Sequence, residues 1–194
     1  HSFLDALERV APPGFPVQLK VDTGMHRVGA PPALAAELAR RVAASPLRLQ
    51  GIWTHFAVAE EDPAFTAEQL RGLQTVAAAL AAEGIRPEMM HAANTAGGLA
   101  YADARLDLVR AGLGLFGLRP APHLAPEVRL RPAMRIVSRV AYLQRLPAGA
   151  RPSYGRRRPL PAEATVATIP MGYADGVPRR LAEGGGGVLI GGRR

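Results

Sequence analysis

The sequence predicts an α/β fold in which part of a (β/α)8 barrel of the TIM type precedes an incomplete β-rich domain. Three observations support this prediction. Strand-like and helix-like segments alternate through residues 1–120, polar side chains follow the ends of the expected strands, and the pattern changes after Pro120. Alternation at this spacing is typical of parallel strands joined by crossover helices.

The expected elements of the barrel part follow one another with short connections. Strands are expected at residues 15–21, 47–53, 86–91 and 106–110, and helices at residues 31–44, 66–84 and 94–100. Two prolines suit the first turn of the first helix. A Thr-x-x-Gln capping box from Thr66 to Gln69 indicates the start of the second helix, and Gly84 suits its C′ position. Asn94 is a good N-cap for the third helix.

Two architectures fit this alternation, a barrel and an open doubly wound sheet. Polar residues stand at or just beyond the carboxyl ends of the expected strands, and they are Lys20, Asp22, Arg27, Thr54, His55, His91, Asn94 and Arg110. Barrels build active sites at this face from several strand ends, whereas an open sheet concentrates a site at one switch point. Because the polar residues follow four successive strands, they favour the barrel.

The chain divides by composition into two parts. Residues 1–120 are expected to form the C-terminal part of a barrel, and the proline-rich residues 121–133 a linker. Residues 134–194 are expected to begin a β-rich domain, because β-like runs at 134–146, 164–169 and 188–190 have no long helix between them. The chain starts at His1 and stops soon after a strand-like run, so we expect a fragment of a longer protein.

The composition limits the possible functions. The chain has 194 residues, of which 48% are hydrophobic, so it can bury a core; it has no cysteine, which excludes disulfides and cysteine-ligated metal. No metal site is expected. No apolar run is long enough to cross a bilayer, so we expect a cytoplasmic protein with no membrane contact. The net charge of +8 comes from scattered arginines and aromatic residues make up 5%, which argues against nucleic-acid binding.

Lys20 is the only lysine among 24 basic residues, and it follows the first expected strand. An amine can lose its proton and react with a carbonyl carbon or with carbon dioxide, which an arginine cannot do. Arg27 could hold a carboxylate with two hydrogen bonds, or it could pair with Asp22 to close the turn. His55 could take part in catalysis or could be a satisfied core residue. The residues alone leave both pairs of alternatives open.

Two loops could bind phosphate at the same face. Asn94 and Thr95 stand where a helix begins, which suits either an N-cap or an anion site, and Gly112 offers an amide after the next strand. In the β-rich part, Tyr154 and Tyr173 each adjoin a glycine, where a hydroxyl could be exposed for chemistry or the ring could belong to a turn. A tyrosine needs a positive neighbourhood before it can act as a base.

Together these segments resemble the alanine racemase family, whose members are pyridoxal-phosphate enzymes of fold type III. The family fold is a barrel that carries the cofactor, followed by a β-rich domain. The segments that carry the resemblance, in order, are Lys20-Val-Asp-Thr-Gly-Met-x-Arg27-x-Gly29, Thr54-His55-Phe-Ala, His91-x-x-Asn94-Thr95, Val109-Arg110-x-Gly112, Gly117-Leu, Ser153-Tyr154-Gly155 and Gly172-Tyr-Ala-Asp-Gly-x-x-Arg179.

The resemblance implies roles for individual residues. Lys20 matches a lysine that many members carry as a carbamate, which orients the arginine matching Arg27 toward the cofactor's phenolic oxygen and the substrate carboxylate. Tyr154 matches a catalytic base that acts in the partner's site of a homodimer. His55 and Arg110 match the pair that polarises this tyrosine and binds the pyridine nitrogen. The remaining matches are phosphate-binding Asn94, Thr95, Gly112 and Leu113, and Tyr173 and Arg179 at the substrate entryway.

The function that the resemblance implies is pyridoxal-phosphate-dependent interconversion of L- and D-alanine, which supplies D-alanine for peptidoglycan. A serine or broad-specificity racemase and a non-catalytic pyridoxal-phosphate-binding homologue are the alternatives. The chain has neither the Lys-Ala-x-Ala-Tyr-Gly motif that binds the cofactor covalently nor the Met-Asp substrate motif, so these 194 residues alone are expected to be inactive. His26 stands where glycine is usual and Phe116 where tyrosine is common, but neither change removes a catalytic group.

Overall fold

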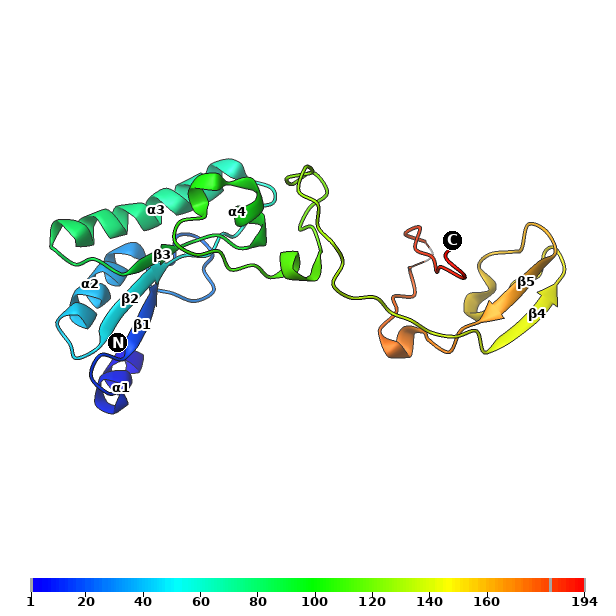
Figure 1. The fold of residues 1–194 in the computed structure, drawn as a ribbon, viewed down its shortest axis with the longest axis horizontal. Coiled ribbons are helices and arrows are strands. Elements are labelled where there is room, and N and C mark those ends of the chain that lie inside the picture. The colour runs from blue at the N-terminus through cyan, green and yellow to red at the C-terminus, as the bar shows by residue number, and fades with distance from the viewer. Residues whose placement is uncertain (1, 182, 194) are drawn as a thin grey trace. The chain divides into compact units, whose positions relative to one another are not determined.

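The computed structural model describes residues 2–181 and 183–193, which form two compact units that divide between Met134 and Arg135 (Figure 1). The first unit combines a parallel sheet with helices, in agreement with the expected α/β class. The second unit is a smaller arrangement of two strands and short helical turns. Each unit has its own architecture.

The sheet of the first unit has three parallel strands in the order β1-β2-β3. They are β1 (Pro16–Lys20), β2 (Arg48–Trp53) and β3 (Met89–His91). The register pairs Lys20 with Trp53, and Trp53 with His91. The last residues of the three strands therefore lie side by side, and because partners in register share a face, their side chains point the same way.

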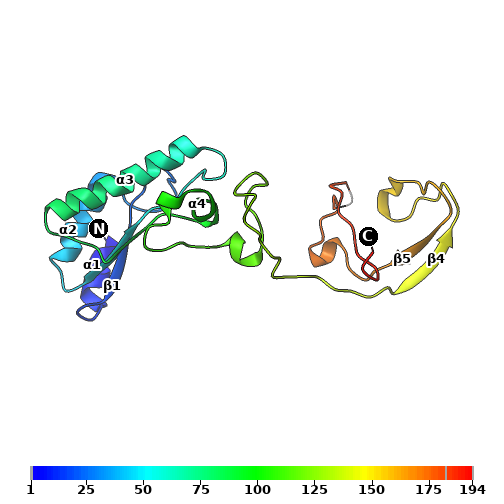
Figure 2. The ribbon, with the colours of Figure 1, turned by 45° about the horizontal axis from the view of Figure 1, so that its top comes forward.

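Helices α2 and α3 pack against the opposite face of this sheet (Figures 1 and 2). The helices of the unit are α1 (Ser2–Val10), α2 (Pro32–Ala43), α3 (Pro63–Ala82) and α4 (Thr95–Ala100). One buried cluster joins Val21 and Ile52 of the sheet region to Ala39 of α2 and to Leu73 and Leu80 of α3. The core thus lies between sheet and helices, which leaves the other face for polar side chains.

Helix α1 was not expected from the sequence. Two ion pairs join it to Arg41 of α2, whose Nη2 lies 2.6 Å from Asp5 and 2.5 Å from Glu8. Because these pairs join residues far apart in the sequence, no local sequence pattern predicts α1 from them.

The strand expected at residues 106–110 is not formed, and that prediction is wrong. The segment runs beside β3, and the amide of Arg110 donates to the carbonyl of Ala93 at 3.0 Å. Leu106 adopts a φ of 44°, in the left-handed region, which bends the chain where the strand would begin. The described sheet therefore has three strands, and isolated backbone bonds replace a fourth ladder.

Helix α3 starts one turn before the expected capping box. Its N-cap is Asp62, whose side chain accepts a hydrogen bond from the amide of Phe65 at 2.9 Å. The Thr66 hydroxyl instead donates to the carbonyl of Asp62 at 2.7 Å, within the first helical turn. The prediction of a capping box at Thr66 is wrong, because the short carboxylate of Asp62 already caps the helix.

The end of α3 follows the prediction. Gly84 has a φ of 81°, which a residue without a side chain adopts without strain, and its amide donates to the carbonyl of Ala81. The amide of Ile85 donates to the carbonyl of Leu80 at 2.9 Å. These two bonds form a Schellman motif, so the C′ position predicted for Gly84 is confirmed.

The second unit contains one antiparallel pair, β4 (Tyr142–Leu146) and β5 (Ala164–Thr168). The run expected at residues 134–146 forms a strand over its last five residues. The run at 188–190 makes an isolated bridge from Ile190 to Arg193, because Gly191 and Gly192 turn the chain back with φ of 57° and 79°. No helix among residues 2–181 and 183–193 combines the length and apolar character that crossing a bilayer requires.

Replacing the cap of α3 tests its observed start. Asp62→Ala is expected to lower the free energy of unfolding by about 1 kcal/mol, because it removes the acceptor of the Phe65 amide. Glu61→Ala, one residue earlier, is the control and should change that free energy by less than about 0.5 kcal/mol. Urea denaturation followed by circular dichroism measures both, and equal effects would contradict the cap.

Candidate active site

The candidate site lies at the carboxyl ends of β1, β2 and β3, on the face away from α2 and α3. Lys20, Trp53 and His91 end the three strands in register. The Trp53 and His91 rings stack with centroids 5.5 Å apart. The next segments of chain bring His55 and Arg110 to the same place, as the spread of polar residues over several strand ends suggested.

Lys20 is buried without a partner. The residue is 9% exposed, and its Nζ has no hydrogen-bond acceptor among the described residues. Nζ lies 5.1 Å from the centroid of the Trp53 ring. Burial lowers the pKa of Lys20, and the charges of Arg27 and Arg110 act in the same direction. A buried amine beside two guanidinium groups would be stabilised by a bound negative charge.

Arg110 is held rigidly by main-chain carbonyls. Its Nη2 donates to the carbonyl of Thr54 at 2.7 Å and to that of Ala92 at 2.8 Å, and its Nη1 donates to Nδ1 of His91. The guanidinium carbon also lies 4.7 Å from the centroid of the Trp53 ring. Burial lowers the pKa of Arg110, but the starting value is so high that the group stays cationic.

Arg110 fixes the tautomers of two histidines. A guanidinium only donates, so Nδ1 of His91 must accept, and its Nε2 therefore carries the hydrogen that Gln18 Oε1 accepts at 2.6 Å. Burial and then the charge of Arg110 lower the pKa of His91 to about 4. Nδ1 of His55 lies 3.3 Å from Nη2 of Arg110, and burial, then Arg110 and Arg27, lower the pKa of His55. Both imidazoles are neutral at pH 7.

The loop after β1 is closed by Asp22 and His26, not by an Asp22–Arg27 pair. The Asp22 carboxylate accepts from the amides of Gly24 and His26, and it lies 3.2 Å from Nδ1 of His26. Burial alone would raise the pKa of Asp22, but these hydrogen bonds lower it overall. Arg27 is exposed and has no carboxylate partner among the described residues, so its guanidinium is available to a ligand.

Thr95 joins the two loops that were expected to bind phosphate. Its hydroxyl oxygen accepts from the amide of Gly112 at 2.9 Å and from that of Gly114 at 3.3 Å. Asn94 caps α4 by accepting from the amide of Gly97 at 2.9 Å, which is its simpler expected role. Leu113 begins the short helical turn η2 (Leu113–Phe116), so the cluster expected around phosphate is contiguous.

The other predicted site residues belong to the second unit. Tyr154 begins the turn η3 (Tyr154–Arg156) and is 79% exposed, with Ser153 at a φ of 70° beside it. Tyr173 begins the turn η4 (Tyr173–Asp175), and the guanidinium carbon of Arg179 lies 5.8 Å from its ring centroid. The structure thus brings the predicted site residues at the strand ends together in the first unit. In the second unit it brings Tyr173 and Arg179 together, with Tyr154 in a separate turn.

Two residues of the site could not be assigned from the sequence. Gln18 accepts from His91, and Trp53 contacts both cations. The available signal was spacing, since Gln18 precedes Lys20 by two residues on a strand and therefore shares its face. No group of three or more His, Asp or Glu in the described part of the chain is arranged to hold a metal ion.

Three basic side chains act on one another through their charges at these strand ends, and they are Lys20, Arg27 and Arg110. The nearby Asp22 carboxylate accepts hydrogen bonds from the amides of its own loop. The fold and the site therefore define an α/β protein with a cationic cluster at the ends of parallel strands, where an anionic group would be stabilised.

Comparison with known proteins narrows this class. Residues 1–120 match the family model of the alanine racemase N-terminal domain, and residues 133–194 match that of the alanine racemase C-terminal domain. The chain belongs to the alanine racemase family.

Individual relatives agree with the family models. Alanine racemase of Symbiobacterium thermophilum is 44% identical over 92% of this chain and 48% of its own length, and that of Chlorobaculum tepidum is 43% identical over 86% and 44%. The crystal structure of alanine racemase from D-cycloserine-producing Streptomyces lavendulae matches with a TM-score of 0.85 at 37% identity, over 99% of this chain and 52% of that one. The chain spans about half the length of the curated relatives it matches.

The neutral state of His91 predicts a pH dependence of stability. Its folded pKa of about 4 lies below the ordinary 6.5, so the unfolded chain binds more protons between these values. The free energy of unfolding should therefore fall by up to about 1.4 kcal/mol per pH unit as pH drops from 6.5 toward 4. Urea denaturation across this range measures the slope, and His91→Gln should reduce it. A slope unchanged in His91→Gln would contradict the assignment.

Proposed function

We propose that the protein interconverts L-alanine and D-alanine with pyridoxal 5′-phosphate as cofactor, and so supplies D-alanine for peptidoglycan. The observation that carries this proposal is the Arg110 guanidinium, which main-chain carbonyls hold beside a neutral His55 at the strand ends. The names of relatives at 44% and 43% identity support it.

We also propose that residues 1–120 belong to a (β/α)8 barrel, that residues 121–133 link it to the next domain, and that residues 134–194 belong to a β-rich domain. The parallel order β1-β2-β3 and the polar residues at the strand ends support the barrel. The antiparallel pair β4 and β5 supports the β-rich domain.

The phosphate of the cofactor has a suitable place at Thr95. The Thr95 oxygen already accepts two amide hydrogens, so its own hydrogen is free to be donated to a phosphate oxygen. The amide of Leu113 has no acceptor within the described residues and would be a second donor. A Cβ at Gly114 would lie 3.0 Å from Thr95 Cγ2, so glycine permits this close packing. Asn94 supports the loop by capping α4.

The pyridine nitrogen of the cofactor would face Arg110. Since a guanidinium has hydrogens to donate and no lone pair to offer, the nitrogen must accept and must remain unprotonated. When bound, pyridoxal phosphate supplies an electron sink for the negative charge that forms at the α carbon of the substrate. Arg110 weakens that sink, which limits side reactions of the carbanion, and the bonds to Thr54 and Ala92 keep it from moving away.

Racemisation requires a base on each face of the α carbon, because a single base would return the proton to the face it came from. We assign one face to Tyr154, which is 79% exposed and is proposed to act in the site of the partner subunit of a homodimer. His55 accepts from Arg110 at Nδ1, so its Nε2 carries a hydrogen that can stabilise the phenolate. The opposite face belongs to the lysine that holds the cofactor in this family.

Arg27 would bind the substrate carboxylate, and Lys20 would hold Arg27 in place. Arg27 has its guanidinium available, and we assign it the carboxylate and the phenolic oxygen of the cofactor. The buried amine of Lys20 would be converted to a carbamate, whose negative charge holds Arg27 in place. Tyr173 and Arg179, which lie against each other, would line the entry to the site.

Exchange of the α proton tests the proposed reaction. In the protein as its gene encodes it, L- and D-alanine are expected to lose their α-proton NMR signals in D2O. Tyr154→Phe should lower kcat by about 100-fold or more, because it removes the hydroxyl that transfers the proton. Tyr142→Phe changes another exposed tyrosine of the same unit and should leave kcat unchanged.

Two outcomes would redirect the assignment. Faster exchange of serine than of alanine would show a serine or broad-specificity racemase. Binding of pyridoxal phosphate without exchange of either amino acid would contradict catalysis and indicate a binding protein.

Carbamate formation at Lys20 has its own test. Burial favours the neutral amine, which forms a bond to carbon dioxide and releases a proton. After incubation with 13C-bicarbonate, a 13C carbamate resonance is expected that disappears in Lys20→Gln. A resonance that persists unchanged in this variant would come from another amine of the protein and would refute the assignment.

A further inference from the structure

The chain leaves the sheet at the end of β2, where the proposed active-site histidine lies. The amide of Thr54 makes the last ladder bond, to the carbonyl of His91 at 3.1 Å. Beyond it, residues 55–57 have no strand beside them. A buried backbone must nevertheless find hydrogen-bond partners.

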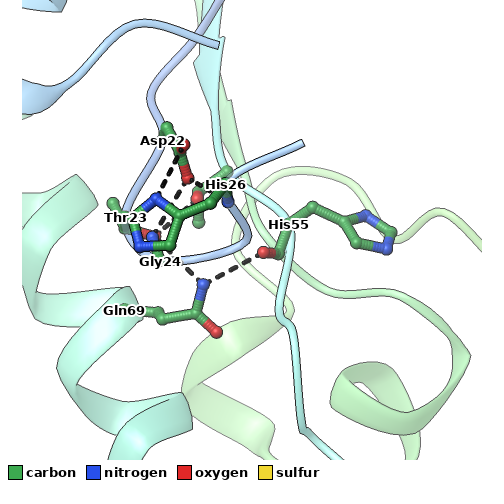
Figure 3. A network of polar contacts seen from close by, with 7 residues as sticks. Asp22, Thr23, Gly24, His26, His55 and Gln69 are labelled. Atoms are coloured by element: carbon green, nitrogen blue, oxygen red, sulfur yellow. Dashed lines mark hydrogen bonds and ion pairs between the residues drawn. The ribbon is translucent and has the colours of Figure 1, made fainter. Parts of the chain in front are cut away.

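The side chain of Gln69 on α3 supplies these partners. Its Oε1 accepts from the amide of Ala57 at 2.9 Å. Its Nε2 donates to the carbonyl of His55 at 3.1 Å (Figure 3). Gln69 is fully buried, with 0% exposure. One side-chain amide thus takes the place of a neighbouring strand and fixes the main chain on both sides of Phe56.

The orientation of this amide is determined by its partners. If the amide were flipped, its NH2 group would face the amide hydrogen of Ala57 and its oxygen would face the carbonyl of His55. Both contacts would be repulsive in a buried place. A side chain at this position must therefore accept at one atom and donate at the other.

Gln69 also reaches the loop that carries Arg27. Its Nε2 lies 3.4 Å from Thr23 Oγ1, and Thr23 Oγ1 lies 2.6 Å from Thr54 Oγ1. Neighbouring residues of α3 support this contact: a Cβ at Gly24 would meet the Phe65 ring at 2.6 Å. A Cβ at Gly72 would meet Thr23 Cγ2 at 3.2 Å.

Phe65, Gln69 and Gly72 follow the spacing i, i+4, i+7, so they form one stripe of α3. The Thr23–Gly24 turn packs against this stripe. The His55 carbonyl accepts a hydrogen bond from Gln69 at the centre of the stripe (Figure 3). We propose that Gln69 is a positioning residue that joins the Arg27 loop to the His55 segment and sets the place of the His55 imidazole beside Arg110. The effect of Gln69 on catalysis rests on the proposed function, whereas its effect on the position of His55 does not depend on that function.

The test compares Gln69→Leu and Gln69→Glu in the protein as its gene encodes it. Leucine can neither accept nor donate. Glutamate keeps the shape and can accept from Ala57; when protonated it can donate to the His55 carbonyl, and when ionised it repels that oxygen. Gln74 lies on the same helix and is exposed, so Gln74→Leu and Gln74→Glu are matched controls.

The first measurement is the titration of the His55 imidazole by NMR, which needs no catalysis. In Gln69→Leu the lowered pKa of His55 is expected to move back toward 6.5, since the ring leaves its half-buried place and the charge of Arg110. In Gln69→Glu the resonances should match those of the unchanged protein at low pH and depart from them as the glutamate ionises. A His55 titration identical in all variants that fold would overturn the proposal.

The second measurement is kcat against pH for alanine racemisation. Gln69→Glu should lower kcat by roughly 10- to 100-fold at high pH, as expected for a misplaced catalytic group. The ratio of its kcat to that of the unchanged protein should rise as pH falls, whereas the Gln74 variants should keep a ratio near 1. A ratio independent of pH would show that Gln69 is structural alone and would overturn the proposal. If the unchanged protein does not racemise alanine, the proposed function fails and the NMR titration alone decides on Gln69.

Discussion

Arginine donates hydrogen bonds and cannot accept them, so each group that is hydrogen-bonded to Arg110 must be an acceptor. Two main-chain carbonyls, those of Thr54 and Ala92, determine where the guanidinium sits. Its remaining hydrogens then require the facing nitrogens of His91 and His55 to be acceptors. Burial is the larger cause of the lowered pKa values of both histidines, and the charge that enforces these tautomers lowers them further. The pH-dependent stability expected of His91 therefore follows from burial together with the Arg110 charge, and the donor role proposed for His55 follows from its bond to Arg110.

The same cation would favour an anion at the site. Lys20 Nζ and the Arg110 guanidinium carbon lie 5.1 Å and 4.7 Å from the Trp53 ring, which can stabilise a cation through its π face. A tryptophan ring carries no net charge, however, so it cannot balance two buried cations. Asp22 offsets part of the charge at Lys20, but its carboxylate accepts three hydrogen bonds from its own loop and forms no ion pair with Lys20 or Arg110 within the described residues. A phosphate, a carboxylate or a carbamate would supply the missing charge, and each of these appears in the proposed reaction.

Local signals in the sequence predicted the parts of the fold that local interactions decide. Pro32 begins α2, and Gly84 ends α3 in a Schellman motif that any alternative side chain would strain. The alternation of strands and helices likewise predicted that Lys20, His55 and Arg110 lie near one another. Contacts between distant segments left no such signal, as Leu106, Gln18 and α1 show.

The start of α3 decides what Gln69 can do. In a capping box that began at Thr66, Gln69 would occupy the N3 position, and its side chain would turn back to bind the amide of Thr66. Asp62 caps the helix one turn earlier, and the Thr66 hydroxyl binds the Asp62 carbonyl within the first turn. Gln69 therefore lies in the second turn, where the backbone amides already have helical partners and its own amide is free to bind His55 and Ala57. A shift of one helical turn, set by a carboxylate on the surface, thus separates a glutamine that caps a helix from one that holds the active-site segment.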